Sequence, residues 1–139
     1  MKQLLEEQAT AKGWGFSYGR KDFQNLVADN MDVDKTYIFL DPVNRKNLTG
    51  NTGAVYARRY RGYFMLLRKS SLDEIYSGAV DAKYEKHIQP LEVQLDGLEL
   101  SLLGCEVQLD IDWESTEIVN VFGENMDGLL VNITVTETL

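Results

Sequence analysis

Hydrophobic positions in the middle of the chain recur with helical spacing. One stripe follows steps of three and four residues and would occupy one side of a helix: Tyr84, Ile88, Leu91, Leu95, Leu98 and Leu102. Pro90 lies within it and lacks a backbone donor, so we expect the helix to kink or divide there. Residues 2–11 predict a shorter helix, and 21–28 a second short one. Ser71 is typical of a helix N-cap.

Other segments alternate with the period of a β-strand. Residues 107–113 and 129–135 place an apolar side chain at every second position, which predicts two half-buried strands. Residues 117–121 are a third candidate. The apolar run 37–40 predicts a buried strand, and the long segment 55–69 predicts an extended strand antiparallel to it.

Two segments lack a clear period. Residues 14–19 combine aromatic residues and glycines, and we interpret them as a bent connection. The stretch from Val43 to Gly53 is rich in Asn, Gly and Thr, and it predicts a long inter-strand loop over residues 42–54. Such a loop exceeds what a hairpin needs, which makes it a candidate contact arm.

Together these elements predict one α+β domain over residues 1–139. We expect an antiparallel β-sheet of about four strands with helices packed on one face. A length of 139 residues fits a single domain, and a hydrophobic content of 44% is ordinary for a globular protein.

Charge is divided between the two halves of the sequence. Residues 1–69 hold twelve Lys and Arg against seven acids, whereas residues 70–139 hold two against fifteen. The formal net charge of the whole chain is −8. Opposite poles on one molecule favour head-to-tail contact with other copies, or contact with a partner of complementary charge.

The sequence contains no motif that predicts catalysis, a cofactor or a metal. The lone Cys105 rules out an internal disulfide, which favours a reducing compartment. The N-terminus lacks the apolar run of a signal peptide, and no stretch approaches the length of a membrane span. We therefore expect a non-enzymatic protein made in a cytoplasm, with no membrane partner.

Two other function classes stay open. Arg58–Lys69 combines arginines with tyrosines, so a nucleic-acid-binding accessory protein is one alternative. Strand alternation would place Arg58 and Arg59 on opposite faces, which favours a protein contact instead. A small enzyme using Asp110, Asp112 and His87 is the other alternative, and it would need the three side chains to share one pocket.

Three stretches resemble a known family. They are the run Tyr37–Pro42 leading into a long loop and strand, the helical segment Tyr84–Leu91, and Asn120–Leu129 running into the final strand. Their order resembles the small tail-terminator or tail-completion proteins of tailed bacteriophages, which lie at the neck or the head-proximal end of the tail. The resemblance implies a structural virion protein, a ring of identical subunits that is often hexameric, and DNA passing through it.

The charge pattern fits this resemblance, because heterologous contacts close into rings when the rotation allows. We expect basic side chains to contact a neighbouring subunit or the next neck or tail ring: Arg45, Lys46, Arg58, Arg59, Arg61 and Arg68. We expect acidic side chains to line a lumen or a partner face, where DNA slides without sequence-specific binding: Glu106, Asp110, Asp112, Glu114 and Glu117. The resemblance places the protein in the virion, assembled in the bacterial host cytoplasm.

Overall fold

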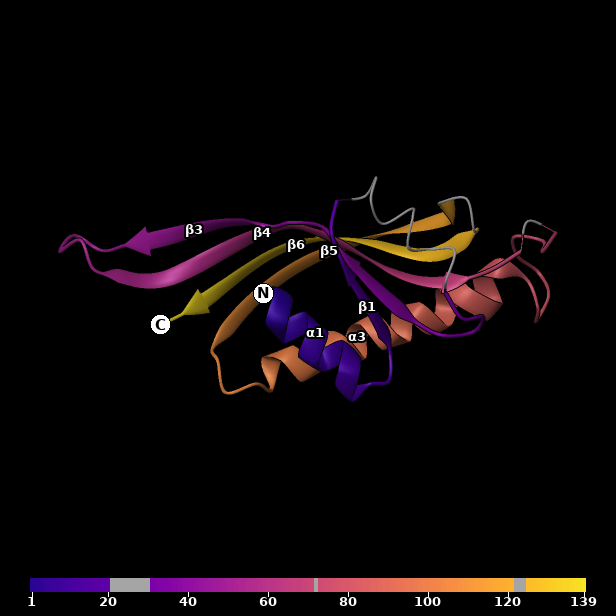
Figure 1. Cartoon of the computed structure of the whole chain (residues 1–139), viewed down its shortest axis with the longest axis horizontal. Coiled ribbons are helices and arrows are strands. Elements are labelled where there is room, and N and C mark those ends of the chain that lie inside the picture. Colours follow the sequence, from indigo (N-terminus) through magenta and orange to yellow (C-terminus); the bar gives the residue numbers. More distant parts are fainter. Residues whose placement is uncertain (21–30, 72, 122–124) are drawn as a thin grey trace.

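The chain folds into a sheet-rich α+β structure, with a six-stranded mixed sheet as one layer and helices as the other (Figure 1). The computed structural model describes residues 1–20, 31–71, 73–121 and 125–139. The described strands are β1 (Gly15–Tyr18), β2 (Tyr37–Leu40), β3 (Asn44–Thr49), β4 (Val55–Lys69), β5 (Leu109–Val121) and β6 (Met126–Thr138). Their order is β1-β2-β4-β6-β5, and β3 pairs with β4 beyond the end of β2.

The prediction of a four-stranded antiparallel sheet is therefore wrong. The described residues form a sheet of six strands, and β1 runs parallel to β2. Residues 107–121 were expected to hold one strand and a second candidate, but β5 is continuous from Leu109 to Val121. The predicted strands at 37–40, 55–69 and 129–135 are confirmed.

The predicted loop at 42–54 contains β3, which forms a hairpin with β4. Gly50 N–H donates to the carbonyl of Ala54 at 3.0 Å and closes the turn. Nearly every residue of β3 is exposed, so neither side of the strand needed apolar residues. Hydrophobic alternation arises only where one face of a strand is buried, which is why the pattern missed this one.

The predicted connection at 14–19 contains β1. Its register places Gly15 opposite Tyr37, and a Cβ at Gly15 would overlap the tyrosine ring. Glycine usually disfavours a strand, but here its lack of a side chain lets β1 lie close to β2. The strand therefore depends on Gly15. The sequence pattern could not reveal this contact between distant segments.

The predicted short helix at 2–11 and the predicted long helical segment at 84–102 are confirmed. They are α1 (Lys2–Ala11) and α3 (Gln89–Leu103), the latter preceded by one π-helical turn, η2 (Tyr84–Ile88). Pro90 occupies the first turn of α3, where its missing donor is tolerated, and the backbone N–H of Gln89 bonds Tyr84 in the π pattern. Residues 73–82 form turns and bends, so the helix start expected at Ser71 is wrong. The helix expected at 21–28 lies outside the described residues.

The main core lies between the helices and one face of the sheet, which we call the helix-covered face. Its side chains include Leu5 of α1, Leu98 of α3, Phe64 of β4 and Val131 of β6. A smaller buried cluster around Phe39 and Met65 lies on the other face, which we call the open face. Strand alternation therefore assigns the side chains of β4, of β6 and of β5 as far as Ile118, where its register shifts, to one face or the other.

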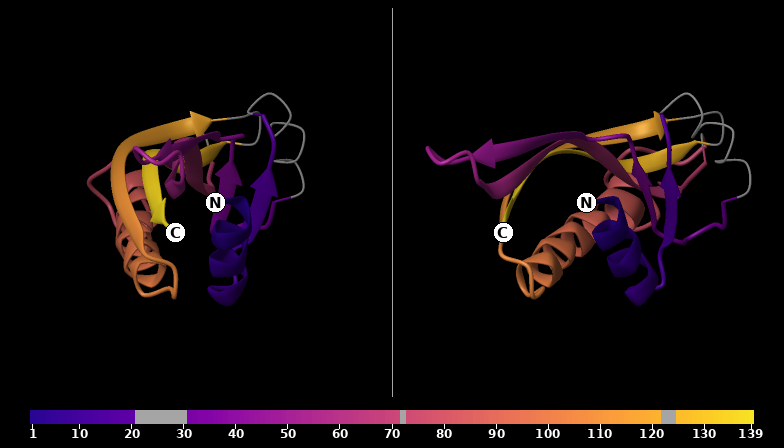
Figure 2. Two further views of the ribbon diagram at one scale, coloured as in Figure 1. Left: turned by 90° about the vertical axis from the view of Figure 1, so that its left-hand side faces the viewer. Right: turned by 60° about the vertical axis from the view of Figure 1, so that its left-hand side comes forward.

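The sheet is longer than its helical layer. β5 and β6 bend along their length and arch over the helices (Figure 2). The β3–β4 hairpin projects beyond the rest of the molecule, and no helix lies beneath it (Figures 1 and 2). This hairpin carries most of the arginines that the sequence analysis singled out.

Candidate interaction surface

Strand alternation separates the arginines of β4. Met65 and Leu67 lie in the cluster of the open face, so Arg59 and Arg61 share that face. Arg58 shares the helix-covered face with Phe64. The prediction that Arg58 and Arg59 lie on opposite faces of the strand is confirmed. The basic segment is therefore not one continuous patch.

Four of the expected contact residues meet at one edge of the sheet. A hollow of about 360 Å³ is lined by the side chains of β3 and β4 that we call the basic edge: Asn44, Arg45, Lys46, Arg59 and Arg61. The register explains the grouping, because Lys46 lies opposite Arg59 and Asn44 opposite Arg61. Lys46, Arg59 and Arg61 gather their positive charges on the open face, which favours a negatively charged partner, whereas Arg45 lies opposite Tyr60 and belongs to the helix-covered face.

The opposite edge of the sheet is acidic. Asp110, Asp112 and Glu114 alternate along β5 with Ile111 and Trp113, which pack into the main core. The three acids therefore point to the open face, and we call them the acidic edge. Asp112 and Glu114 line a hollow of about 130 Å³ together with side chains of β6.

Rows of paired residues connect the two edges across the open face. One row runs Lys46, Arg59, Thr136 and Asp110, and the next runs Asn44, Arg61, Thr134 and Asp112. Threonines of β6 thus separate positive from negative side chains. The charge split along the sequence becomes a charge split across one face of a single sheet.

Four expected site residues lie elsewhere. Arg68 stays within the fold, where its guanidinium donates to the Lys86 carbonyl at 3.3 Å and to Thr36 Oγ1 at 3.4 Å. Arg58 lies half-buried on the helix-covered face. Glu106 is exposed in the connection before β5, and Glu117 lies on the helix-covered side of β5 near Glu92. Neither expected set forms one surface.

A buried polar cluster escaped the sequence analysis. Lys83 is 1% exposed, and its ammonium donates to Asp127 Oδ2 at 3.2 Å, Asn120 Oδ1 at 2.6 Å and Ser70 Oγ at 3.3 Å. Asp127 is fully buried, and its Oδ1 accepts the Asn120 backbone N–H at 2.7 Å. These contacts attach the segment before η2 to the β5–β6 pair. The position of Lys83 as one of only two lysines in the acidic half of the sequence was the available signal.

The same region contains a possible cation-binding group. Ligand atoms of Glu74, His87 and Asp127 lie within 4.8 Å of one another, and His87 Nε2 is 3.1 Å from Glu74 Oε2. The Lys83 ammonium already neutralises Asp127, however, and its charge would repel a divalent ion. We therefore regard the group as part of the buried polar cluster.

The residues of the small-enzyme alternative do not meet. His87 is buried beneath the helix-covered face, whereas Asp110 and Asp112 are exposed on the open face. General acid–base catalysis needs its groups within hydrogen-bond reach of one substrate. This particular set therefore forms no site.

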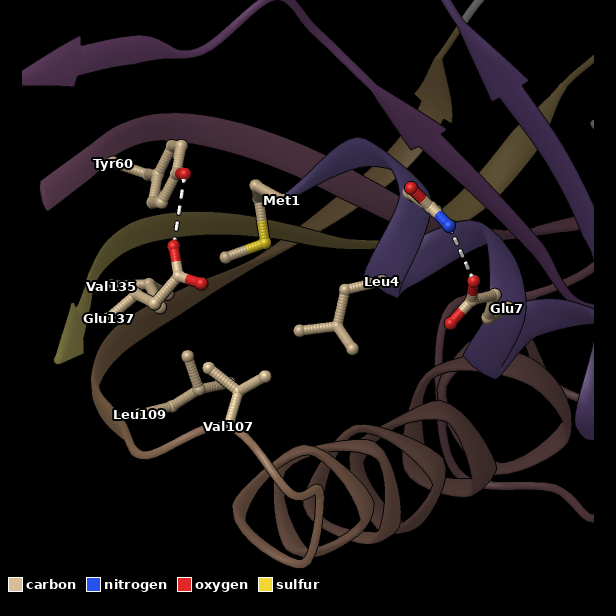
Figure 3. Close-up of a pocket in the computed structure, with 9 residues that line it drawn as sticks. Met1, Leu4, Glu7, Tyr60, Val107, Leu109, Val135 and Glu137 are labelled. Carbon is tan, nitrogen blue, oxygen red and sulfur yellow. Dashed lines mark hydrogen bonds between the residues drawn. The ribbon is translucent and has the colours of Figure 1, made fainter. Parts of the chain in front are cut away.

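A further pocket of about 210 Å³ lies between α1 and the ends of β4, β5 and β6 (Figure 3). Met1, Leu4 and Leu109 give it apolar walls, and the carboxylate of Glu137 accepts a bond from Tyr60 at 3.2 Å. Its lining residues contain no nucleophile paired with a base.

Comparisons of the chain with protein-family models, curated proteins and solved structures gave no match. Among the described residues, no helix has the length and apolar character needed to cross a bilayer. The interaction surface must therefore be interpreted from its own geometry.

Proposed function

We propose that the protein is a structural subunit that joins head-to-tail with copies of itself into a closed ring. The observation that carries this proposal is the basic edge at one side of the sheet and the acidic edge at the other. Like charges within each edge oppose contact between identical edges, whereas unlike edges attract. A contact between two different surfaces generates a ring when the rotation closes.

The family resemblance in the sequence implies where such a ring would lie. In a tailed bacteriophage it would act as a tail-terminator, tail-completion or neck component at the head–tail junction, possessing no enzymatic activity. The open face supports a lining role, since the described part of the chain places both α-helices on the other side. DNA would pass its mixed row of charged and threonine side chains without sequence-specific contact.

Charge reversal on one edge tests the proposal. Arg59→Glu with Arg61→Glu should convert the basic edge and lower the solution mass at a concentration where the unchanged chain forms a discrete oligomer. Multi-angle light scattering at low and high salt provides the measurement, and salt should weaken assembly of the unchanged chain. Lys2→Glu in α1 with Lys12→Glu at its C-cap is a control with the same charge change. An unaltered mass for the Arg59/Arg61 variant would overturn the proposal.

A second candidate function rests on the same basic edge. The hollow with Arg45, Lys46, Arg59 and Arg61 suits the phosphates of a nucleic acid. Tyr63 lies on the same face but is less favourable for stacking on a base, because its hydroxyl is hydrogen-bonded to Asp41. That hydrogen bond raises the pKa of Tyr63 above its ordinary value. Titration with single-stranded DNA separates the candidates: steep loss of affinity with salt favours binding, and no affinity at low salt removes it.

A further inference from the structure

We infer that copies of the chain join by pairing β3 of one subunit with β5 of the next, which extends one sheet through the assembly. This inference rests on the proposed function and names the contact that would build the ring. Among the described strands, β3 pairs only with β4, and β5 pairs only with β6. Each therefore presents one edge of backbone donors and acceptors able to accept another strand.

Strand direction fits such a joint. β5 runs antiparallel to β6, β6 antiparallel to β4, and β4 antiparallel to β3. Consequently β3 and β5 point in opposite directions within one subunit. A rotation about an axis along the strands preserves these directions, so β3 would meet the neighbour's β5 as an ordinary antiparallel pair.

Side-chain parity sets the register. Continuing the sheet keeps the open face on one side, so Lys46 must lie opposite an acid of the same face: Asp110, Asp112 or Glu114. An unstaggered ring repeats each row at one height, which places Lys46 opposite Asp110. Strand tilt in a closed sheet shifts the partner by two or four residues, to the next acids.

Charge also opposes the competing symmetric joints. Pairing β5 with β5 would bring the acidic edges of two copies together, and pairing β3 with β3 would bring together Arg45 and Lys46 of each. Like charges directly opposite one another destabilise a strand pair, and unlike charges stabilise it. Charge thus disfavours pairing between two copies of the same edge and favours pairing between the basic edge and the acidic edge.

Cysteine pairs across the proposed joint provide the main test. In a Cys105→Ser background, Lys46→Cys is combined in turn with Asp110→Cys, Asp112→Cys and Glu114→Cys. Opposed residues of an antiparallel pair lie close enough for a disulfide. The matched control combines Lys46→Cys with Glu117→Cys, whose side chain belongs to the helix-covered face. The molar mass of each sample is measured by light scattering, and the sample is then oxidised and run on a non-reducing denaturing gel.

A ladder of covalent multimers from at least one of the three pairs, exceeding the control, is the expected result. Dimers as the largest product would indicate a two-fold joint and overturn the inference. Oligomers in solution without cross-links above the control would overturn the strand pairing but leave ring assembly standing. Monomers without cross-links would overturn both.

A charge exchange tests the same joint without cysteines. Lys46→Glu alone and Asp110→Lys alone should each weaken assembly about tenfold, measured as the concentration of half-assembly. The double variant should recover most of the loss if the two side chains face each other. If the double variant loses as much assembly free energy as the two single variants together, the unstaggered register is wrong. Asp112→Lys, combined with Lys46→Glu in the same way, then tests the shifted register.

Discussion

Charged side chains are paired in the interior of the molecule and kept apart at the edges of its sheet. Inside, Lys83 and Asp127 meet at 3.2 Å and satisfy each other together with Asn120 and Ser70. At the edges, cations and acids are kept apart by the threonines of β6. Charges paired in the interior are costly to leave without a partner, whereas charges held apart at the edges remain available to other molecules.

The largest expected effect is in the interior. Asp127→Ala should lower the free energy of unfolding by about 3–5 kcal/mol, because it leaves the Lys83 ammonium buried without its counter-charge. Urea denaturation followed by circular dichroism measures the change. The double variant Lys83→Met with Asp127→Asn removes both charges and should lose less. A cost for Asp127→Ala below about 1 kcal/mol would contradict the role given to the pair.

A matched pair of leucines on α3 sharpens the comparison between inside and outside. Leu98 is fully buried, whereas Leu100, two residues later, is 71% exposed. Leu98→Ala should cost about 2–5 kcal/mol through lost burial and the cavity left behind. Leu100→Ala should stay within about 0.5 kcal/mol in the same denaturation experiment. Similar costs for both would mean that the helix faces are assigned wrongly.

The edges should matter little for the fold. Arg59→Glu with Arg61→Glu is expected to change the free energy of unfolding of the monomer by no more than about 1 kcal/mol, because Arg61 is exposed, Arg59 is only half-buried, and charges near the surface contribute little to stability. Denaturation at a concentration below assembly provides the measurement. A much larger loss would show that these arginines serve the fold rather than association.

The smallest expected effect concerns pH. Burial, followed by a hydrogen bond and charge repulsion from Glu117, raises the pKa of Glu92 above its ordinary value. Its protonated form therefore stabilises the folded state at low pH, and this contribution is lost as pH rises through the raised pKa. Glu92→Gln should melt slightly above the unchanged chain at pH 7 and close to it near about pH 4. Thermal melts across this range test it, with Glu106→Gln as the charge control.

Periodic segments were the predictable part of the fold. α1, α3 and β6 bury mainly one side and were revealed by their hydrophobic spacing, whereas β2 and the 64–67 part of β4 are buried on both sides and stood out as runs of apolar residues. β3 projects from the body with polar residues on both sides, and β1 depends on the fit of Gly15 beside Tyr37. Both lacked the alternation that burial on one face imposes, and both were missed.

The candidate site was predictable in kind but not in arrangement. The arginines of 58–61 and the acids of 110–114 stood out by charge alone. Their assignment to faces followed from strand period, as for Arg58 and Arg59. The same strand period separates Arg68 and Glu117 from the two edges, and only their neighbours, Lys86 and Glu92, depended on the tertiary structure.

The sequence by itself determined the charge asymmetry of its halves and the segments that bury an apolar side, because both are properties of local residue order. Only the tertiary structure decided that Lys46 and Asp110 end at opposite edges of one sheet. Strand order and register set that placement through contacts between segments far apart in the chain. Local patterns encode which faces are buried, and long-range pairing decides which charges become neighbours.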